Sequence, residues 1–210
     1  MTHKLLRIIT DSGKVKQVGY NRRAHERNFT FSTTCQGQST MSETEERLFS
    51  IRPLESEDRN WVAHFLDKNW GSTKIVSRGQ SYYGHLLPGF AAEMNDAPED
   101  AQPAGLITYN IEGKDCEILT LDSNQAGLGI GSALLDMVKV VAKEDGCKRL
   151  WLVTTNDNME ALRFYQRRDW ELVAIHRNAL IAARKMKPQI PLVGKNEIPL
   201  RDEIELELKL

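Results

Sequence analysis

The clearest pattern along the chain is a helical one. From Ile130 to Glu144, apolar residues recur three and four positions apart, which predicts a helix that packs one face on a sheet. Gly146 follows as its stop signal. A similar amphipathic run begins at Ser56, which we place as the N-cap, and ends at Gly71. The predicted helices comprise residues 56–71, 130–144, 158–168 and 177–187.

Shorter apolar runs between these helices predict strands. The two best defined runs are joined by the turn 112–115 and form a strong hairpin candidate. The last segment alternates, with Ile204, Leu206, Leu208 and Leu210 on one face, and predicts a terminal strand. The predicted strands comprise residues 48–54, 73–79, 86–95, 104–113, 116–123, 149–155, 170–175 and 203–210.

The order of these elements defines the expected fold class. A strand and a helix are followed by several strands, and then by a helix, a strand, a helix and two strands. A doubly wound parallel fold needs strands and helices to alternate throughout, which this chain does not show. We therefore predict an α/β (α+β) protein with a mixed, mostly antiparallel sheet flanked by helices, in one domain over residues 41–210.

Composition fits a soluble globular protein, with 40% hydrophobic and 27% charged residues. The net charge of −1 gives no sign of a nucleic-acid or membrane partner. Residues 1–40 differ, because they carry seven basic and two acidic groups, and Met41 then begins a stretch that looks like a natural protein start. We interpret residues 1–40 as a disordered basic arm or a start-site artefact. A nucleic-acid-binding arm is the less favoured alternative.

The cysteines and the apolar runs indicate the compartment. Cys35, Cys116 and Cys147 are odd in number and lack metal-ligand spacing, so we expect structural thiols, a reducing compartment and no bound metal. No apolar run reaches the ~18 residues of a membrane-spanning helix. The N-terminus lacks the apolar core of a secretory signal. A cytoplasmic protein is therefore the expectation.

A glycine-rich turn precedes the helix that starts at Ile130. Gly127, Gly129 and Gly131 fall between an apolar strand and this helix, a place where proteins commonly bind phosphate. A dinucleotide fingerprint is disfavoured because Ser132 occupies its third glycine position and no acid ends the next strand. A P-loop is disfavoured because no Lys follows Gly131. A turn with only a packing role stays open at this point.

The turn is followed by a second motif. Residues 129–131 have the Gly-x-Gly form of a pyrophosphate turn, and the later helix carries Asn158, Ala161 and Tyr165 at the spacing Asn-x-x-Ala-x-x-x-Tyr. In this order, separated by a helix and an apolar strand, the two motifs resemble those of the acyl-CoA-dependent N-acyltransferases of the GNAT superfamily. The resemblance covers roughly residues 48–176. It implies acetyl-CoA as co-substrate and a sheet splayed at the cofactor site.

The resemblance also implies how the cofactor is held. The pantetheine arm would lie in the opening like an extra strand, and the pyrophosphate would accept backbone N–H groups of the turn. The family's Arg or Gln before the turn is replaced here by Ala126, so backbone donors should carry most of the binding. The amide of Asn158 would contact the cofactor, cap its helix, or both. The expected cofactor-binding residues are Leu119, Thr120, Leu121, Ala126, Gly127, Leu128, Gly129, Ile130, Gly131, Ser132 and Asn158.

Two residues are expected to be catalytic in the attack of an amine on a thioester. Tyr165 matches the family's tyrosine that serves the leaving thiolate, and its alternative role is a core residue covering the sheet. Glu117 lies on the strand leading to the splay, where some family members carry a catalytic glutamate that acts as general base. Its alternative role is that of a hydrogen-bonded or exposed strand residue, with a water chain as base.

The end of the tyrosine helix departs from the family pattern. Asp169-Trp170 stands where the family often has Gly-Phe. Aspartate tolerates a left-handed backbone better than most residues do, so the helix can still end here.

The acceptor side is less well determined by the sequence. Residues 77–89 fall where the family builds part of its acceptor site. Within them, Arg78, Tyr83 and His85 are candidates to bind a carboxylate or phosphate of the acceptor, or to serve in turn packing.

The sequence as a whole predicts an N-acetyltransferase that moves an acetyl group from acetyl-CoA to a primary amine. We favour a small-molecule acceptor, because nothing in the sequence suggests a long peptide groove. We also favour direct attack in a ternary complex, since no cysteine lies in either motif. The alternatives are a protein or peptide N-acetyltransferase and a non-catalytic acyl-CoA-binding module. A homodimer is compatible with each of these hypotheses, whereas nucleic-acid and membrane partners are not expected.

Overall fold

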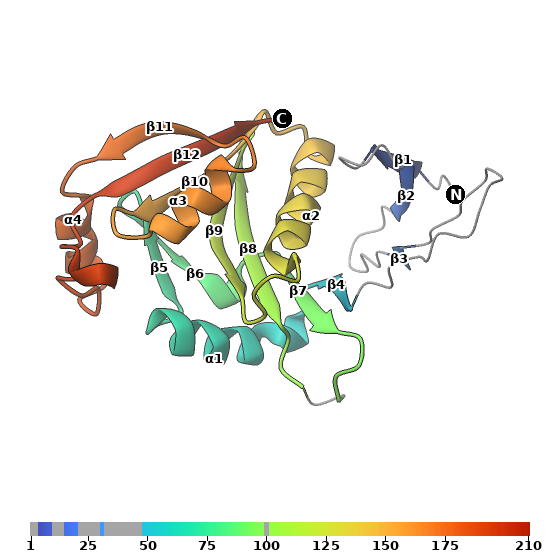
Figure 1. The fold of residues 1–210 in the computed structure, drawn as a ribbon, viewed down its shortest axis with the longest axis horizontal. Helices are drawn as coiled ribbons and strands as arrows, with labels where there is room; N and C mark the ends of the chain where they lie inside the picture. Colours follow the sequence, from blue (N-terminus) through green and yellow to red (C-terminus); the bar gives the residue numbers. More distant parts are fainter. Residues whose placement is uncertain (1–3, 10–14, 21–29, 32–47, 99–100) are drawn as a thin grey trace.

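A computed structural model describes residues 4–9, 15–20, 30–31, 48–98 and 101–210. Its main strands are β4 (Phe49–Pro53), β7 (Gly89–Met94), β8 (Gly105–Glu112), β9 (Asp115–Ser123), β10 (Arg149–Thr155), β11 (Glu171–His176) and β12 (Glu203–Lys209). They form a seven-stranded sheet in the order β11-β12-β10-β9-β8-β7-β4 (Figure 1). Within it only β9 and β10 are parallel neighbours. The predicted mixed, mostly antiparallel sheet is confirmed.

The α-helices agree with the sequence pattern except at one start. They are, in the described part of the chain, α1 (Arg59–Trp70), α2 (Ile130–Glu144), α3 (Met159–Gln166) and α4 (Ala179–Met186). The prediction of Ser56 as N-cap of α1 is wrong. The 3-10 turn η1 (Ser56–Asp58) precedes α1, because the carboxylate of Asp58 accepts the backbone N–H of Glu55 at 2.8 Å. Gly71 after α1 and Asp169 after α3 adopt the left-handed conformation, with φ of 69° and 62°.

The sheet separates two hydrophobic clusters. On β8, Ile107 belongs to a large core with Leu134 of α2 and Tyr165 of α3. Its neighbour Leu106 packs with Val62 of α1 instead. Successive residues of a strand point to opposite faces. Therefore α2 and α3 cover one face of the sheet, and α1 packs on the other (Figure 1).

A two-stranded hairpin, β5 (Lys74–Ser77) and β6 (Gln80–Tyr83), lies outside the main sheet. The sequence pattern predicted a strand at residues 73–79 but missed its return strand. Arg78 and Gly79 form the turn, with φ of 45° and 76°, and positive values at both central residues are what a type I′ turn requires. The pairing places Ser77 and Tyr82 on one face of the hairpin.

An irregularity in β9 accompanies the opening of the sheet. Ile118 and Thr120 pair with neighbouring residues of β8, so Leu119 between them is bulged. A bulge bends its strand and interrupts the ladder. The parallel pairing of β9 with β10 joins only residues 115–117 to residues 149–151, and the strands diverge beyond that point. The predicted splay is confirmed.

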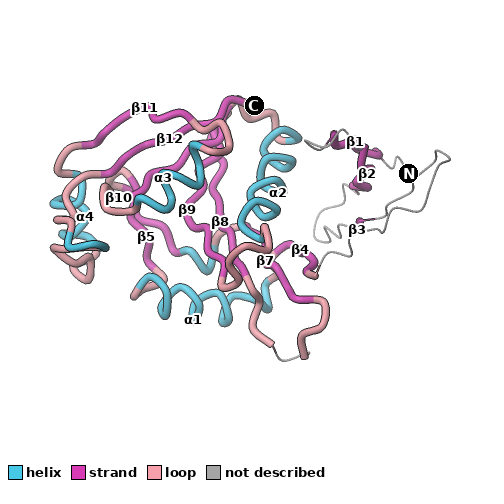
Figure 2. The backbone as a smooth tube through the Cα atoms, in the orientation of Figure 1, coloured by secondary structure: helices cyan, strands magenta, loops and turns pink. Residues whose placement is uncertain are grey.

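The predicted terminal strand is β12, which enters the sheet between β10 and β11. Leu206 is buried in the large core and the other apolar residues of that face pack against it, as predicted. The opposite face carries Glu203 and Glu205, which are also buried. The connection from β11 to β12 carries α4 (Figure 2). This helix contacts β5, and Nζ of Lys74 donates to the carbonyl of Met186 at 2.9 Å.

Much of the predicted N-terminal arm lies outside the described residues. The strands described there are β1 (Lys4–Ile9), β2 (Val15–Tyr20) and β3 (Thr30–Phe31), which pair with one another in an antiparallel sheet. The disorder and the role expected of residues 1–40 therefore stay predictions.

Two of the three cysteines fall in the described part of the chain. Cys116 and Cys147 are buried free thiols, whereas Cys35 lies outside the described residues. Among the helices that the structure describes, none is long and apolar enough to cross a membrane.

Candidate active site

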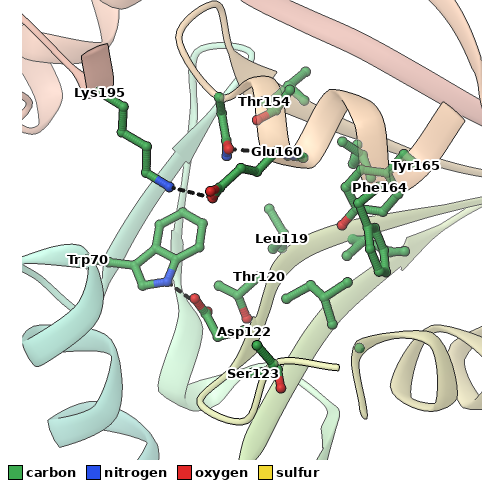
Figure 3. Close-up of a pocket in the computed structure, with 18 residues that line it drawn as sticks. Trp70, Leu119, Thr120, Asp122, Ser123, Thr154, Glu160, Phe164, Tyr165 and Lys195 are labelled. Atoms are coloured by element: carbon green, nitrogen blue, oxygen red, sulfur yellow. Dashed lines mark hydrogen bonds and ion pairs between the residues drawn. The ribbon is translucent and has the colours of Figure 1, made fainter. Parts of the chain in front are cut away.

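The larger cavity occupies the opening between β9 and β10 (Figure 3). Its volume of about 590 Å³ lies within the range of small-molecule sites. One wall is formed by residues 118–123 of β9, and the facing wall by residues 152–154 of β10 together with α3. Because the two strands no longer pair here, the backbone groups of β9 on this side can bind an extended ligand.

The glycine turn borders this cavity, and Ala126 and Gly131 are its residues that line it. Gly127 and Gly129 have φ of 82° and 78°, a conformation that other residues rarely adopt. Gly129 is the N-cap of α2, and its carbonyl accepts the N–H of Ala133 at 3.0 Å. The N–H groups of Ile130 and Gly131 precede this first helical bond and have no acceptor inside the helix. With the positive end of the helix dipole, they fit an anionic group such as a pyrophosphate.

The predicted cofactor residues fall into two groups. Asn158 lines the cavity and also caps α3, since its Oδ1 accepts the N–H of Ala161 at 3.2 Å. The other predicted residues that line the cavity are Leu119, Thr120, Leu121, Ala126 and Gly131. The remaining ones build the turn and the first turn of α2 without lining the cavity, and they are Gly127, Leu128, Gly129, Ile130 and Ser132.

A cation that the sequence pattern did not single out lies at the start of α2. The guanidinium of Arg168 donates to Oγ of Ser132 from Nε at 3.1 Å and also from Nη2. It lies over the ring of Phe164, 3.7 Å from the centroid, and Phe164 lines the cavity. Arg168 thus brings positive charge close to the turn, where Ala126 provides none.

Tyr165 lines the cavity from α3. Its ring packs against Phe164 and Trp170, with centroids 5.0 and 5.1 Å away. Burial, and to a smaller extent the charge of Asp122, raise the pKa of Tyr165, so the phenol stays protonated. Among the described residues its hydroxyl has no hydrogen-bond partner (Figure 3). The hydroxyl is therefore available to donate to a ligand.

Trp70 and Asp122 also line the cavity, although sequence reasoning picked neither. Nε1 of Trp70 donates to Oδ2 of Asp122 at 2.8 Å, which ties the end of α1 to β9 (Figure 3). Burial raises the pKa of Asp122, against the effect of this hydrogen bond. Simple alternation from Ile118 would place Asp122 on the face of α2. The bulge at Leu119 reverses the alternation, and no sequence signal marks it.

A second cavity, of about 360 Å³, lies on the hairpin side of the sheet. It is lined by residues of the β5–β6 hairpin and by Glu117 and Trp151. These last two residues are paired with each other and form the final rung before β9 and β10 diverge. Ile118, the next residue of β9, lines the larger cavity. Consecutive residues of β9 therefore line the two cavities at the point where the splay begins.

The Glu117 side chain, predicted as the base, faces this second cavity. It is only 4% exposed, and both of its oxygens accept hydrogen bonds. Oγ of Ser77 donates to Oε1, and the hydroxyl of Tyr82 donates to Oε2 at 3.1 Å. Burial raises the pKa of Glu117, while the two hydrogen bonds and the charge of Arg78 act in the opposite direction. A carboxylate whose pKa is raised in this way is suited to accept a proton.

The three predicted acceptor residues lie in different surroundings. Arg78 lines the second cavity, but its Nη1 forms an ion pair with Glu205 at 3.2 Å. Tyr83 is 55% exposed, and its ring meets that of His85 edge-on at 6.2 Å. Neither Tyr83 nor His85 lines either of the two cavities. Their roles in binding stay predictions.

An opened sheet, with a glycine turn suited to an anion on one side and a buried carboxylate on the other, fits the class of acyl-CoA-dependent acyltransferases. Over residues 51–170 the chain matches the family described as Acetyltransferase (GNAT) family. The match spans more than half of the chain, and the protein therefore belongs to the GNAT acetyltransferases.

Similar proteins support this assignment. The chain is 42% identical over 154 residues to the uncharacterized protein YdhI of Bacillus subtilis (strain 168), which covers 73% of this chain and 94% of that protein. It is 42% identical over 161 residues to the uncharacterized protein YxbD of the same organism, and the match covers 77% of this chain and 99% of that protein.

Solved structures share the fold at lower identity. An IAA acetyltransferase from Bacillus cereus ATCC 14579 has a TM-score of 0.55 and 21% identity, covering 77% of this chain and 99% of that one. A GNAT family acetyltransferase from Elizabethkingia anophelis with acetyl-CoA bound has a TM-score of 0.54 and 20% identity, covering 79% and 100%.

Proposed function

We propose that the protein is an N-acetyltransferase that transfers the acetyl group of acetyl-CoA to the primary amine of a small molecule. Acetyl-CoA would supply an acetyl thioester in the larger cavity. Its pantetheine arm would bind along residues 119–121 and its pyrophosphate at residues 127–132. The structure from Elizabethkingia anophelis, which has acetyl-CoA bound, supports this choice of co-substrate.

The observation that carries the proposal is the position of Glu117. Its strand pairs with β10 up to this residue, and the next residue, Ile118, already faces the larger cavity. Glu117 itself faces the second cavity. An amine entering from the hairpin side would therefore meet a buried carboxylate at the edge of the opening that would hold the thioester.

Two side chains and a backbone group would each have a different role in the reaction. Glu117 would accept the proton of the attacking amine. A backbone N–H of the bulged stretch, at Leu119 or Leu121, would stabilise the charge that develops on the carbonyl oxygen. The hydroxyl of Tyr165 would donate a hydrogen bond to the departing thiolate of CoA and stabilise its charge, without itself becoming ionised. None of the described cysteines, Cys116 and Cys147, lines either cavity, which supports direct attack by the amine.

Two other functions stay as alternatives. A protein or peptide acceptor is less favoured, because the cavity beside Glu117 has a volume of only about 360 Å³. A non-catalytic acyl-CoA-binding module would leave the burial of Glu117 and its two hydroxyl donors without a purpose.

The test is a survey of acceptors with the purified protein. Release of CoA from acetyl-CoA is followed with a thiol reagent in the presence of amino acids, polyamines, aminoglycosides and peptides, and CoA binding is measured by calorimetry. We expect turnover with small amines, reduced by about 100-fold or more in Glu117→Gln. Turnover with peptides only would favour the first alternative, and binding without turnover the second. Absence of CoA binding would overturn the proposal.

A further inference from the structure

The β5–β6 hairpin pairs with no strand of the main sheet, yet it reaches the proposed base. Ser77 is the last residue of β5, and Tyr82 lies near the end of β6 on the same face. Their hydroxyls donate to different oxygens of Glu117. Ser77 is 4% exposed, so water does not compete freely for its hydrogen bond. Each carboxylate oxygen therefore has its own donor from one element.

The buried position of Glu117 makes these donors consequential. A base must be ionised to accept a proton, and burial disfavours the charged form of a carboxyl group. Hydrogen bonds to the ionised form favour it in return. The charge of Arg78 also favours ionisation of Glu117, whereas that of Glu203 on β12 opposes it. The other ionisable groups that line the same cavity include Glu112, Asp115 and Tyr82. His176 does not line the cavity but interacts with Glu203 and Glu205.

Tyr82 is suited to donate rather than to ionise. Burial and the nearby charge of Glu117 raise the pKa of Tyr82 to about 12. Its oxygen is also 2.8 Å from the side-chain oxygen assigned to Gln80. A phenol has one proton, and amide oxygen and nitrogen are interchangeable assignments. With the amide of Gln80 turned to donate, the chain of hydrogen bonds runs from Gln80 to Tyr82 to Glu117.

We infer that Ser77 and Tyr82 are positioning residues that hold the carboxylate of Glu117 ionised and oriented at the splay. This inference rests on the proposed function, in which Glu117 is the base. It assigns to the hairpin a role in setting the pH range of acetyl transfer. The hairpin then does more than form one wall of the acceptor cavity.

The first arm of the test needs no acceptor. The carboxyl ¹³C resonance of Glu117, identified by its loss in Glu117→Gln, is titrated by NMR in protein labelled at glutamate. We expect Ser77→Ala and Tyr82→Phe each to raise the midpoint by about one pH unit. Ser77→Thr keeps a hydroxyl and should restore the original midpoint. Ser81→Ala is the matched control, because Ser81 lies on the other face of β6, and its Oγ is directed at the sulfur of Met186.

The second arm measures turnover against pH with an amine found in the survey. Loss of activity in Ser77→Ala and Tyr82→Phe should approach about 10-fold below the original midpoint, shrink between the two midpoints and disappear above the new one, where Glu117 ionises again. A loss of equal size at every pH would indicate a structural role and overturn the inference. Unchanged midpoints in both variants would also overturn it, while leaving the acetyltransferase proposal intact. Full turnover in Glu117→Gln would instead remove the base assignment, and the role of the hairpin with it.

Discussion

Tyr165 packs in the core and is also the proposed donor to the departing sulfur, and a single substitution separates these two roles. Its ring packs against Trp170, while its hydroxyl lacks a partner among the described residues. Tyr165→Phe keeps the ring, so the affinity for acetyl-CoA and the thermal stability should change little. Turnover should fall by about 10–100-fold, as expected when a proton donor is lost. Steady-state kinetics together with calorimetry test this, and unchanged turnover would show that another group serves the sulfur.

Glu117 also contributes to the dependence of the protein's stability on pH. Burial raises the pKa of Glu117 above its value in the unfolded chain, so the folded state binds this proton more tightly. As the pH rises above the unfolded value and through the folded one, the stability contributed by this group is lost. In the Glu117→Gln variant the side chain cannot ionise, so this loss of stability does not occur. The melting temperature of this variant, relative to that of the original protein, should therefore increase as the pH rises above the ordinary glutamate value of 4.5 and through the raised pKa of folded Glu117. A constant difference would contradict the argument.

At the level of elements, we expect a substitution in the first turn of α2 to increase stability and to weaken ligand binding. A Cβ added at Gly131 would meet the ring of Phe164 at 3.5 Å, an ordinary contact, without backbone strain. Gly131→Ala should therefore raise the free energy of unfolding by about 0.5 kcal/mol. The methyl group would stand at the cavity wall where the pyrophosphate is proposed to approach, so the Kd for CoA should increase by about tenfold.

Gly113→Ala provides the matched control for this prediction. Gly113 lies in the β8–β9 turn with φ of 62° and open space around it. Alanine there should lower stability and leave the Kd for CoA unchanged. Calorimetry and thermal unfolding of both variants test the pair. A Gly131→Ala variant with the original affinity would mean that the pyrophosphate does not approach this residue.

The elements also show which features a sequence can predict. The spacing of apolar residues predicted α2 from Ile130 to Glu144, because one face of a helix on a sheet repeats strictly. The β5–β6 hairpin was missed because Arg78 occupies a turn position that usually holds Asn, Asp or Gly. If that turn had been recognised, the alternation of side chains would have placed Tyr82, and not Tyr83, on the same face of the hairpin as Ser77.

On the scale of the whole molecule, the two cavities differed in how far they could be predicted. The larger cavity, the proposed cofactor site, is built from contiguous motifs on β9, α2 and α3, whose order along the chain is visible in the sequence. The second cavity, the proposed acceptor site, combines residues of the hairpin with Glu117 of β9, and the buried acidic residues of β12 pair with its Arg78. Alternation predicted the apolar face of β12, but nothing local indicated that Glu203 and Glu205 would be buried as well. Only the tertiary arrangement brings these segments together.

The charge around the acceptor cavity follows from that arrangement. The net charge of the chain is only −1, yet Glu112, Asp115 and Glu117 line the cavity. Of its cations, Arg78 is paired with Glu205, and the nearby Arg149 is paired with Asp115, Glu205 and Glu207. Negative charge is therefore in excess, which favours a cationic acceptor over the carboxylate or phosphate that Arg78 alone would suggest.

This excess predicts the selectivity among amines. A diamine should have a kcat/KM about 5–10-fold above that of an alkyl monoamine of equal length, because its second cation is attracted by the carboxylates. High salt should reduce the advantage by screening. Glu112 lies at the exposed rim of the cavity. Glu112→Gln should reduce the preference for the diamine and leave kcat/KM for the monoamine nearly unchanged. Initial rates at low and high ionic strength test this. A preference for amino acids bearing a free carboxylate would contradict it and would assign the dominant role to Arg78.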